Sequence, residues 1–137
     1  MVHALRQIHR SLTPDGVLLD VHPQPTNSRI EVWQDRRVHD LGEVDQEEEN
    51  REIEDARGRL ELVVKEGLFT PETSDYFEAG EHHDSVSSWQ EHWAEEEYQL
   101  IAPAGMLESA ERLLSSGGGE LVIRESVRAT RLRRLES

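Results

Sequence analysis

Histidines beside carboxylates are the residues of this sequence with the clearest chemical potential. Glu81, His82, His83 and Asp84 are consecutive, and His92 follows nearby. Imidazole and carboxylate groups are both metal ligands in proteins. In an extended segment, however, neighbouring side chains point to opposite faces, so His82 and His83 would not bind the same ion. We therefore predict polar residues at a strand end and no metal, with His82 and His83 as the candidates if a metal binds.

His22, Trp89 and Trp93 are the candidate ligand-binding residues. His22 follows an apolar run, and ligands of α/β proteins bind beyond the carboxyl ends of strands. Trp89 and Trp93 are four residues apart, so they share one face of a helix. Tryptophans at this spacing are more often part of a core or an interface, and a histidine after a strand is more often a plain loop residue. A small-molecule pocket at these residues is therefore an alternative interpretation.

Two further segments resemble ligand-binding loops in composition alone. Glycines 117–119 follow a predicted helix and precede a predicted strand, whereas a phosphate-binding loop follows a strand and opens a helix. The acidic segment 43–55 spreads its carboxylates over several faces of a helix and lacks the spacing of a calcium loop. A Ser–His–Asp arrangement is not readable from sequence order, so the catalytic residues stay unknown.

The composition excludes several classes of protein. The chain has 137 residues, with 15 Lys and Arg against 29 Asp and Glu, a formal net charge of −14. This charge repels a nucleic-acid backbone and an anionic membrane surface. There is no cysteine, which excludes disulfides and thiolate chemistry. No apolar stretch approaches the roughly 20 residues that span a bilayer, so we expect a cytoplasmic protein that binds neither nucleic acid nor membrane.

The elements that would position these residues are helices alternating with strands. Helices are predicted over 2–12, 45–66 and 104–115, with another that carries the two tryptophans after a cap at Asp84 or Ser85. Strands are predicted over 17–21, 72–82 and 120–134, with a hairpin over 29–41. The continuous apolar run of the first strand predicts cover on both of its faces, and the hairpin is expected outside the main core. The chain length fits one α/β domain over residues 1–137.

The opening segment resembles a known family. Residues 4–21 read ALRQIHRSLTPDGVLLDV, which is similar to the ALREIHRVLKPGGVLLDV stretch of Rossmann-like S-adenosylmethionine-dependent methyltransferases, with Asp15 where Gly is common. Residues 84–89 also resemble some bacterial members. The resemblance implies the helix before the fifth strand, that strand, a long helix, a sixth strand, a helix and a seventh strand antiparallel to its neighbours. The expected fold is thus a partial Rossmann-like sheet, its last three strands mixed parallel and antiparallel, with an added hairpin.

The same resemblance implies what the chain lacks. In the family, the first strand leads into the glycine-rich loop that cradles S-adenosylmethionine, and an acidic residue that ends the second strand holds the ribose. These strands have no counterpart in the sequence. We therefore expect no cofactor bound by this chain alone and no residue to which a cofactor role can be assigned.

The absent fourth strand would leave the strand at 17–21 with an open edge of unpaired backbone groups. We therefore expect a homodimer, or a complex with a separate protein chain, through that edge. The leading interpretation is a methyltransferase-like domain that is inactive alone and acts by self-association or partner binding. The alternatives are one piece of a split methyltransferase and a small-molecule binding module.

Overall fold

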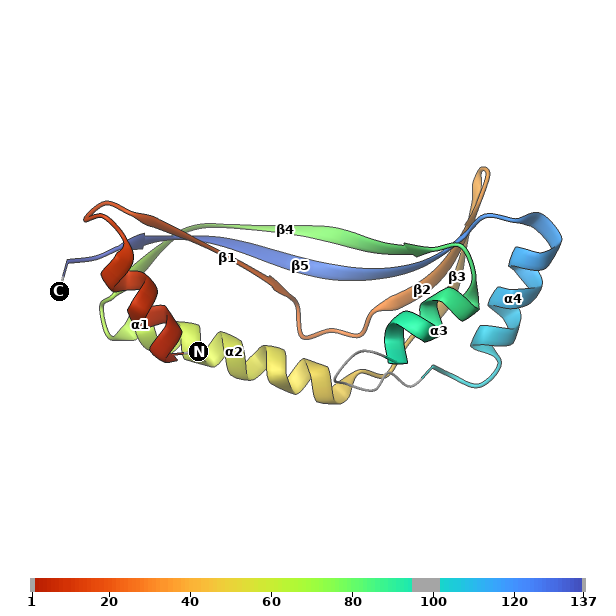
Figure 1. Cartoon of the computed structure of the whole chain (residues 1–137), viewed down its shortest axis with the longest axis horizontal. Helices are drawn as coiled ribbons and strands as arrows, with labels where there is room; N and C mark the ends of the chain where they lie inside the picture. The colour runs from red at the N-terminus through yellow and green to blue at the C-terminus, as the bar shows by residue number, and fades with distance from the viewer. Residues whose placement is uncertain (1, 95–101, 137) are drawn as a thin grey trace. The chain divides into compact units, whose positions relative to one another are not determined.

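The computed structural model describes residues 2–94 and 102–136, which form an α/β arrangement (Figure 1). The elements in chain order are α1 (Val2–Ser11), β1 (Val17–Pro23), β2 (Arg29–Gln34), β3 (Arg37–Glu43), α2 (Glu47–Lys65), β4 (Phe69–His83), α3 (Val86–Ala94), α4 (Met106–Gly117) and β5 (Glu120–Arg134). The predicted α/β class is confirmed. No helix of the described ranges has the length and apolarity needed to cross a membrane.

The chain divides into two compact units. Unit 1 comprises Met1–Pro25, Arg51–Phe77 and Val127–Ser137, and unit 2 comprises Thr26–Asn50 and Glu78–Ser126. Segments far apart in the sequence therefore build each unit, and the strands β4 and β5 contribute residues to both.

Local chemistry explains where the helices begin and end. The α1 helix stops before a turn in which the backbone N–H of Gly16 donates to the carbonyl of Thr13 at 2.8 Å. The α2 helix opens with an acidic first turn, which complements the helix dipole. The side chain of Asp45 accepts from the backbone N–H of Glu47 at 3.1 Å, and Ser85 caps α3 by accepting from the N–H of Ser88 at 3.0 Å. These contacts satisfy backbone donors that have no partner within the helix.

In unit 1, β5 lies between β1 and β4. The β1–β5 pairing is antiparallel and regular from Val17 opposite Arg133 to Pro23 opposite Val127. The β4 strand also pairs with β5, and the hydroxyls of Ser74 and Thr130 meet across this pair at 3.1 Å. Since a strand has two edges, β1 and β4 take opposite edges of β5.

In unit 2, the β2–β3 hairpin joins the sheet. Residue Asp35 makes the turn with a positive φ of 37°, and β2 pairs antiparallel with β5 from Arg29 opposite Arg124 to Trp33 opposite Glu120. The prediction that the hairpin lies outside the main core is wrong, because Ile30 and Val32 are fully buried. Alternation along β2 directs both of these side chains toward α3 and α4, where they join the core of unit 2.

The expectation of a mixed parallel and antiparallel sheet of three strands is also wrong. In the part of the chain that the structure describes, the sheet has five strands, and the pairs β1–β5, β2–β3 and β2–β5 are all antiparallel. In unit 1 the reason is the position of β5. It separates β1 from β4, so these two strands do not pair with each other directly.

Each unit has its own hydrophobic core. In unit 1, apolar side chains of α1 and α2 pack on one face of the sheet; the buried members are Leu5, Leu60, Val63, Phe69 and Leu132. In unit 2, α3 and α4 cover the sheet; the buried members are Ile30, Val32, Val44, Val86, Trp89, Met106, Ala110, Leu121 and Ile123. The helices in both units thus follow the apolar stripes that the sequence predicts.

Strand β1 is covered on one face only. Leu18 packs against the unit 1 core, next to its cross-strand partner Leu132. Leu19 and Val21 point the other way and remain 68% and 57% exposed. The prediction of cover on both faces is therefore wrong, because both helices of unit 1 that build its core lie on the Leu18 side.

Candidate functional site

The outer strands of a sheet carry backbone groups that can pair with another chain, and proteins usually protect them with bulges, proline or charge. The β3 edge in unit 2 is protected in this way. Its pairing with β2 shifts register, with Ile30 opposite Gly42 but Glu31 opposite Asp40. Gly42 has a φ of 114° at this irregularity, which only glycine adopts readily. Arg29 binds the Asp40 carboxylate with two nitrogens, and this contact lowers the pKa of Asp40.

The β4 edge in unit 1 is protected by proline and charge. Pro71 has no backbone N–H to offer a neighbour, and Asp75 adds a negative charge to the same exposed stretch. Glu72 binds Arg131 and Arg133 at 3.0 and 3.1 Å, and these two guanidinium groups lower the pKa of its carboxyl. An incoming strand would have to desolvate these charges.

The β1 edge in unit 1 has fewer of these protections, because Pro23 stands only at its end and Asp20 is on the helix-facing side. Among the described residues, β1 pairs with β5 alone, and that pairing has no register shift. Val17, Leu19 and Val21 share the face that α1 and α2 leave uncovered; we call them the apolar row. A regular strand with one unpaired edge and an exposed apolar face is the surface that β-strand addition requires.

His22 and Asp20 lie on the opposite, helix-facing side of β1. The Nδ1 atom of His22 is 2.8 Å from a carboxylate oxygen of Asp20. Both line a recess of about 20 Å³ in unit 1, together with Arg57 and Arg128. This volume accommodates about one water molecule. The contact with Asp20 fixes the orientation of the imidazole, but the recess is too small for a metabolite.

Trp89 and Trp93 belong to unit 2. Trp89 is 3% exposed and forms part of the core, with the centroid of its ring system 6.4 Å from that of Trp93. The recess that His22 lines contains neither tryptophan. The three candidate ligand-binding residues are thus not brought into one described pocket.

His82 and His83 diverge as strand alternation predicts. His82 contacts Glu120 and packs edge-on against Trp33. His83 lies on the other face, where Glu81 Oε1 is 2.9 Å from its Nε2 and 2.8 Å from His92 Nε2. Within residues 2–94 and 102–136, no group of three His, Asp or Glu side chains is arranged to hold a metal ion.

The Glu81 contact was not predicted from the sequence, although its members were noted there. His92 of α3 contacts the Glu81 carboxylate. The charge of Glu81 also acts on the carboxyl group of Glu125 in β5. Burial raises the pKa of Glu125, and the carboxylates of Glu49 and Glu81 raise it further. Residues i and i+2 of a strand lie on the same face, so the alternation of the sequence could have predicted that Glu81 and His83 lie side by side.

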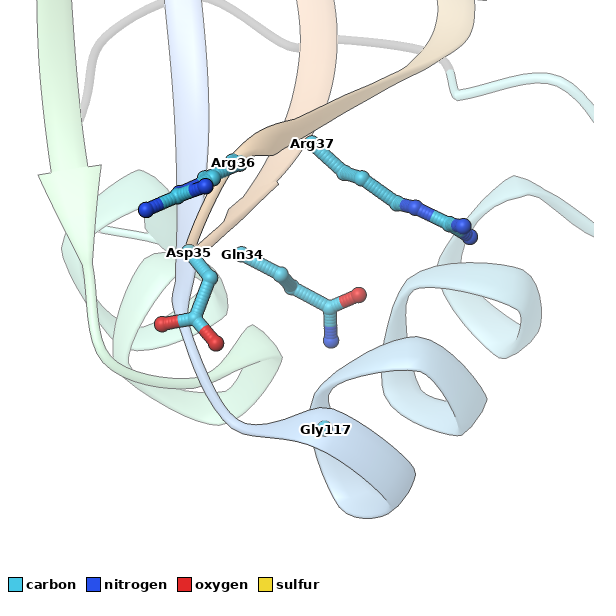
Figure 2. Close-up of a pocket in the computed structure, with 5 residues that line it drawn as sticks. All are labelled: Gln34, Asp35, Arg36, Arg37 and Gly117. Carbon is cyan, nitrogen blue, oxygen red and sulfur yellow. The ribbon is translucent and has the colours of Figure 1, made fainter.

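A hollow of about 680 Å³ lies at the tip of the β2–β3 hairpin. Figure 2 shows that Arg36 and Arg37 extend in opposite directions from this tip. Gln34 points toward α4, where its Nε2 donates to the carbonyls of Leu113 and Gly118 at 2.6 and 2.8 Å. Because the two arginines do not converge and Gln34 already binds the helix end, this hollow offers no assembled ligand site.

Comparison of the chain with protein-family models, curated proteins and solved structures finds no match. The function therefore has to be inferred from the geometry of the molecule, and the β1 edge is its most distinctive surface.

Proposed function

We propose that this chain is a methyltransferase-like domain that does not transfer methyl groups alone and acts by pairing with another polypeptide along β1. The observation that carries the proposal is the contrast among the sheet edges. The edges of β3 and β4 are protected by a bulge, proline and charge, whereas β1 combines an unpaired edge with exposed Leu19 and Val21. An unpaired strand edge with exposed apolar side chains promotes aggregation unless a partner covers it, so its presence favours a binding role.

The strand order of unit 1 supports the methyltransferase-like part of the proposal. The resemblance implies a last strand that is antiparallel to its neighbours, and β5 lies between β1 and β4 in that manner. The long helix α2 connects the segment that contains β1 and the hairpin to β4, as the resemblance also implies. On this interpretation the free edge of β1 is the place where a fourth strand would pair.

A split methyltransferase is the second candidate, and the same edge favours it. In that case the partner would be a polypeptide that carries the glycine-rich loop and the ribose-binding acid of the cofactor site. The two candidates share the docking surface and differ in what the complex does. Only the split enzyme would bind S-adenosylmethionine once the partner is added.

Titration of the purified chain with S-adenosylmethionine in a calorimeter tests the claim that it is inactive alone. We expect no binding at micromolar concentration, and micromolar binding would overturn this part of the proposal. The docking claim is tested by co-purification of tagged chain with a companion in stoichiometric amount. We expect Leu19→Lys to lose the companion and Val38→Lys to retain it, because Val38 is similarly exposed, at 59%, but lies on the protected β3 strand.

A further inference from the structure

We propose that the polypeptide that pairs along β1 is a second copy of this chain, in an antiparallel register centred on Leu19. This inference rests on the proposed function and names its partner. A two-fold axis perpendicular to the sheet would pair β1 with β1 of the second copy and extend the sheet of unit 1 across both copies. A symmetric contact of this kind must be self-complementary, because each residue meets its counterpart in the same strand.

Strand geometry limits the possible registers to a few. Residues opposite each other in an antiparallel pair point to the same face. The two-fold axis keeps the uncovered faces of both copies on the same side of the sheet. Two opposed residues must therefore both have odd numbers or both have even numbers, and their sum is even. For the central part of β1, the axis can therefore pass through Leu18, Leu19 or Asp20.

The register centred on Leu19 matches apolar residues along the whole apolar row. Leu19 lies opposite Leu19 of the second copy, and Val17 lies opposite Val21 in both directions. All three side chains are on the face that the helices of unit 1 leave uncovered. Pairing would therefore bring together the Leu19 and Val21 side chains that are 68% and 57% exposed in the single chain. Apolar cross-strand pairs of this type stabilise a sheet.

The other registers are disfavoured by charge. An axis through Asp20 places two carboxylates directly opposite each other, and opposed like charges destabilise a strand pair. An axis through Leu18 places Val21 opposite Asp15, which leaves part of the apolar row next to a charge. In the Leu19 register, Asp20 lies opposite Leu18 on the helix-facing side, and it keeps its contact with His22 in the same chain.

The absence of cysteine from the sequence allows a direct test. In the proposed register, cysteines introduced by Leu19→Cys face each other across the two-fold axis, with Cβ atoms about 4.5–5.5 Å apart. Mild oxidation, or a short bis-maleimide, should link two copies into one covalent dimer. In the Val21→Cys variant the two thiols are about 13 Å apart along the strand direction, so no disulfide should form. The double variant Val17→Cys/Val21→Cys should restore the link.

Light scattering of the unmodified chain and the variant Val38→Cys complete the design. We expect a dimer mass at tens of micromolar, cross-linking of Leu19→Cys, and no cross-linking of Val38→Cys on the β3 edge. Leu19→Asp should weaken self-association at least about tenfold, because it places like charges opposite each other.

The outcomes separate the two proposals. Efficient cross-linking of Leu19→Cys alone among the single variants supports the two-fold dimer. A stoichiometric companion of different sequence, with no cross-linking at position 19, overturns the dimer and leaves the proposed function standing. A monomer without any companion overturns both.

Discussion

The outer strand β3 of unit 2 and the outer strand β1 of unit 1 differ in how readily they could pair with another chain. In unit 2 the outer strand β3 is irregular, turns on a glycine with positive φ and carries Asp40 in an ion pair with Arg29. In unit 1 the outer strand β1 is regular, and Leu19 and Val21 are exposed beside an unpaired edge. One chain thus contains both a strand edge that resists pairing and one that permits it.

This difference shows that an exposed strand is not by itself an interaction site. Val38 of β3 is nearly as exposed as Leu19 of β1, yet the bulge between Asp40 and Gly42 farther along the same strand and the ion pair of Asp40 oppose a regular ladder with a new strand. What distinguishes β1 is a regular backbone, apolar side chains of its own on the uncovered face, where the nearest charges are Arg131 and Arg133 of β5, and continuity with a packed core through Leu18.

The largest expected effect separates the two faces of unit 1. Leu132→Ala removes a side chain that is 1% exposed and packs in the core with Leu5 and Phe69. We expect it to lower the free energy of unfolding by about 2–5 kcal/mol. Leu19→Ala should change it by less than about 0.5 kcal/mol in the monomer. Urea unfolding at low protein concentration measures both, and equal losses would show that the uncovered face of β1 is packed after all.

The second prediction concerns the bulge that protects β3. Gly42→Ala forces a Cβ onto a φ of 114°, and we expect a loss of about 1–3 kcal/mol. Gly58→Ala in the middle of α2 meets no atom within 4 Å and should stabilise by about 0.5–1 kcal/mol. Thermal unfolding of the two variants compares them. A neutral Gly42→Ala would mean that the irregularity in β3 is not held in place by its glycine.

The third prediction compares two carboxylates. Glu125 in unit 2 is affected by other carboxylates, whereas Glu72 in unit 1 is paired with two arginines. The pKa of Glu125 in unit 2 is raised above its ordinary value of 4.5 by burial and by Glu49 and Glu81. The folded state therefore holds this proton more tightly, and stability falls as the pH rises above about 4.5. Glu125→Gln should stabilise at pH 7 by no more than about 1 kcal/mol, because the side chain is only half-buried.

That gain should disappear at pH 4 and below, where Glu125 is protonated in the folded protein. Glu72 in unit 1 provides the opposite case, because Arg131 and Arg133 lower its pKa. Its contribution is present above pH 4.5 and is lost as the pH falls through its lowered pKa. Glu72→Gln should therefore destabilise slightly at neutral pH. Unfolding curves at pH 4 and pH 7 check both signs, and a loss of stability in Glu125→Gln at pH 7 would contradict the interpretation.

The smallest expected effect is the response of self-association to salt. Each copy carries a formal net charge of −14, so two copies repel each other at low ionic strength. Raising the salt concentration from about 0.05 to 0.5 M shortens the screening length and should strengthen the dimer a few-fold. Sedimentation or light scattering at two salt concentrations measures this. Weakening by salt would instead indicate a partner with complementary positive charge.

The sequence predicts most helices and strands to within a few residues, and the strand expected over 120–134 has its observed bounds in β5. The helix expected over 45–66 is observed at Glu47–Lys65, because Ile53, Leu60 and Val63 mark a single apolar stripe. The strand expected over 72–82 is observed as the longer β4, Phe69–His83. An edge strand with eight consecutive exposed residues lacks the alternation that would mark its ends in the sequence.

The position of the hairpin in the core depends on partners that are distant in the sequence. Glu31 is 3% exposed, which a charged residue in an alternating strand does not suggest. It is accommodated because Arg124 of β5 lies 3.2 Å from its carboxylate and Trp33 donates to it at 3.0 Å. Neither the pairing of β2 with β5 nor this contact follows from local pattern.

The candidate site could be predicted only in part, because it too depends on contacts between residues that are distant in the sequence. The resemblance pointed to the edge at residues 17–21, but the apolar run of that strand does not reveal which face stays exposed. The helices that settle this question, α1 and α2, contribute Leu5, Leu60 and Val63 to the Leu18 side. Which face a helix covers depends on chain connections, and a single sequence does not specify them.

The central position of β5 has a consequence for the order of events during synthesis. Strands β1, β2 and β4 all pair with β5, which follows every one of them in the chain. While the ribosome is still making β5, the β2–β3 hairpin is the one pair of described strands that can already form its ladder. The apolar residues of the earlier strands must therefore wait, exposed to chaperones and to one another, until residue 120 and its successors emerge.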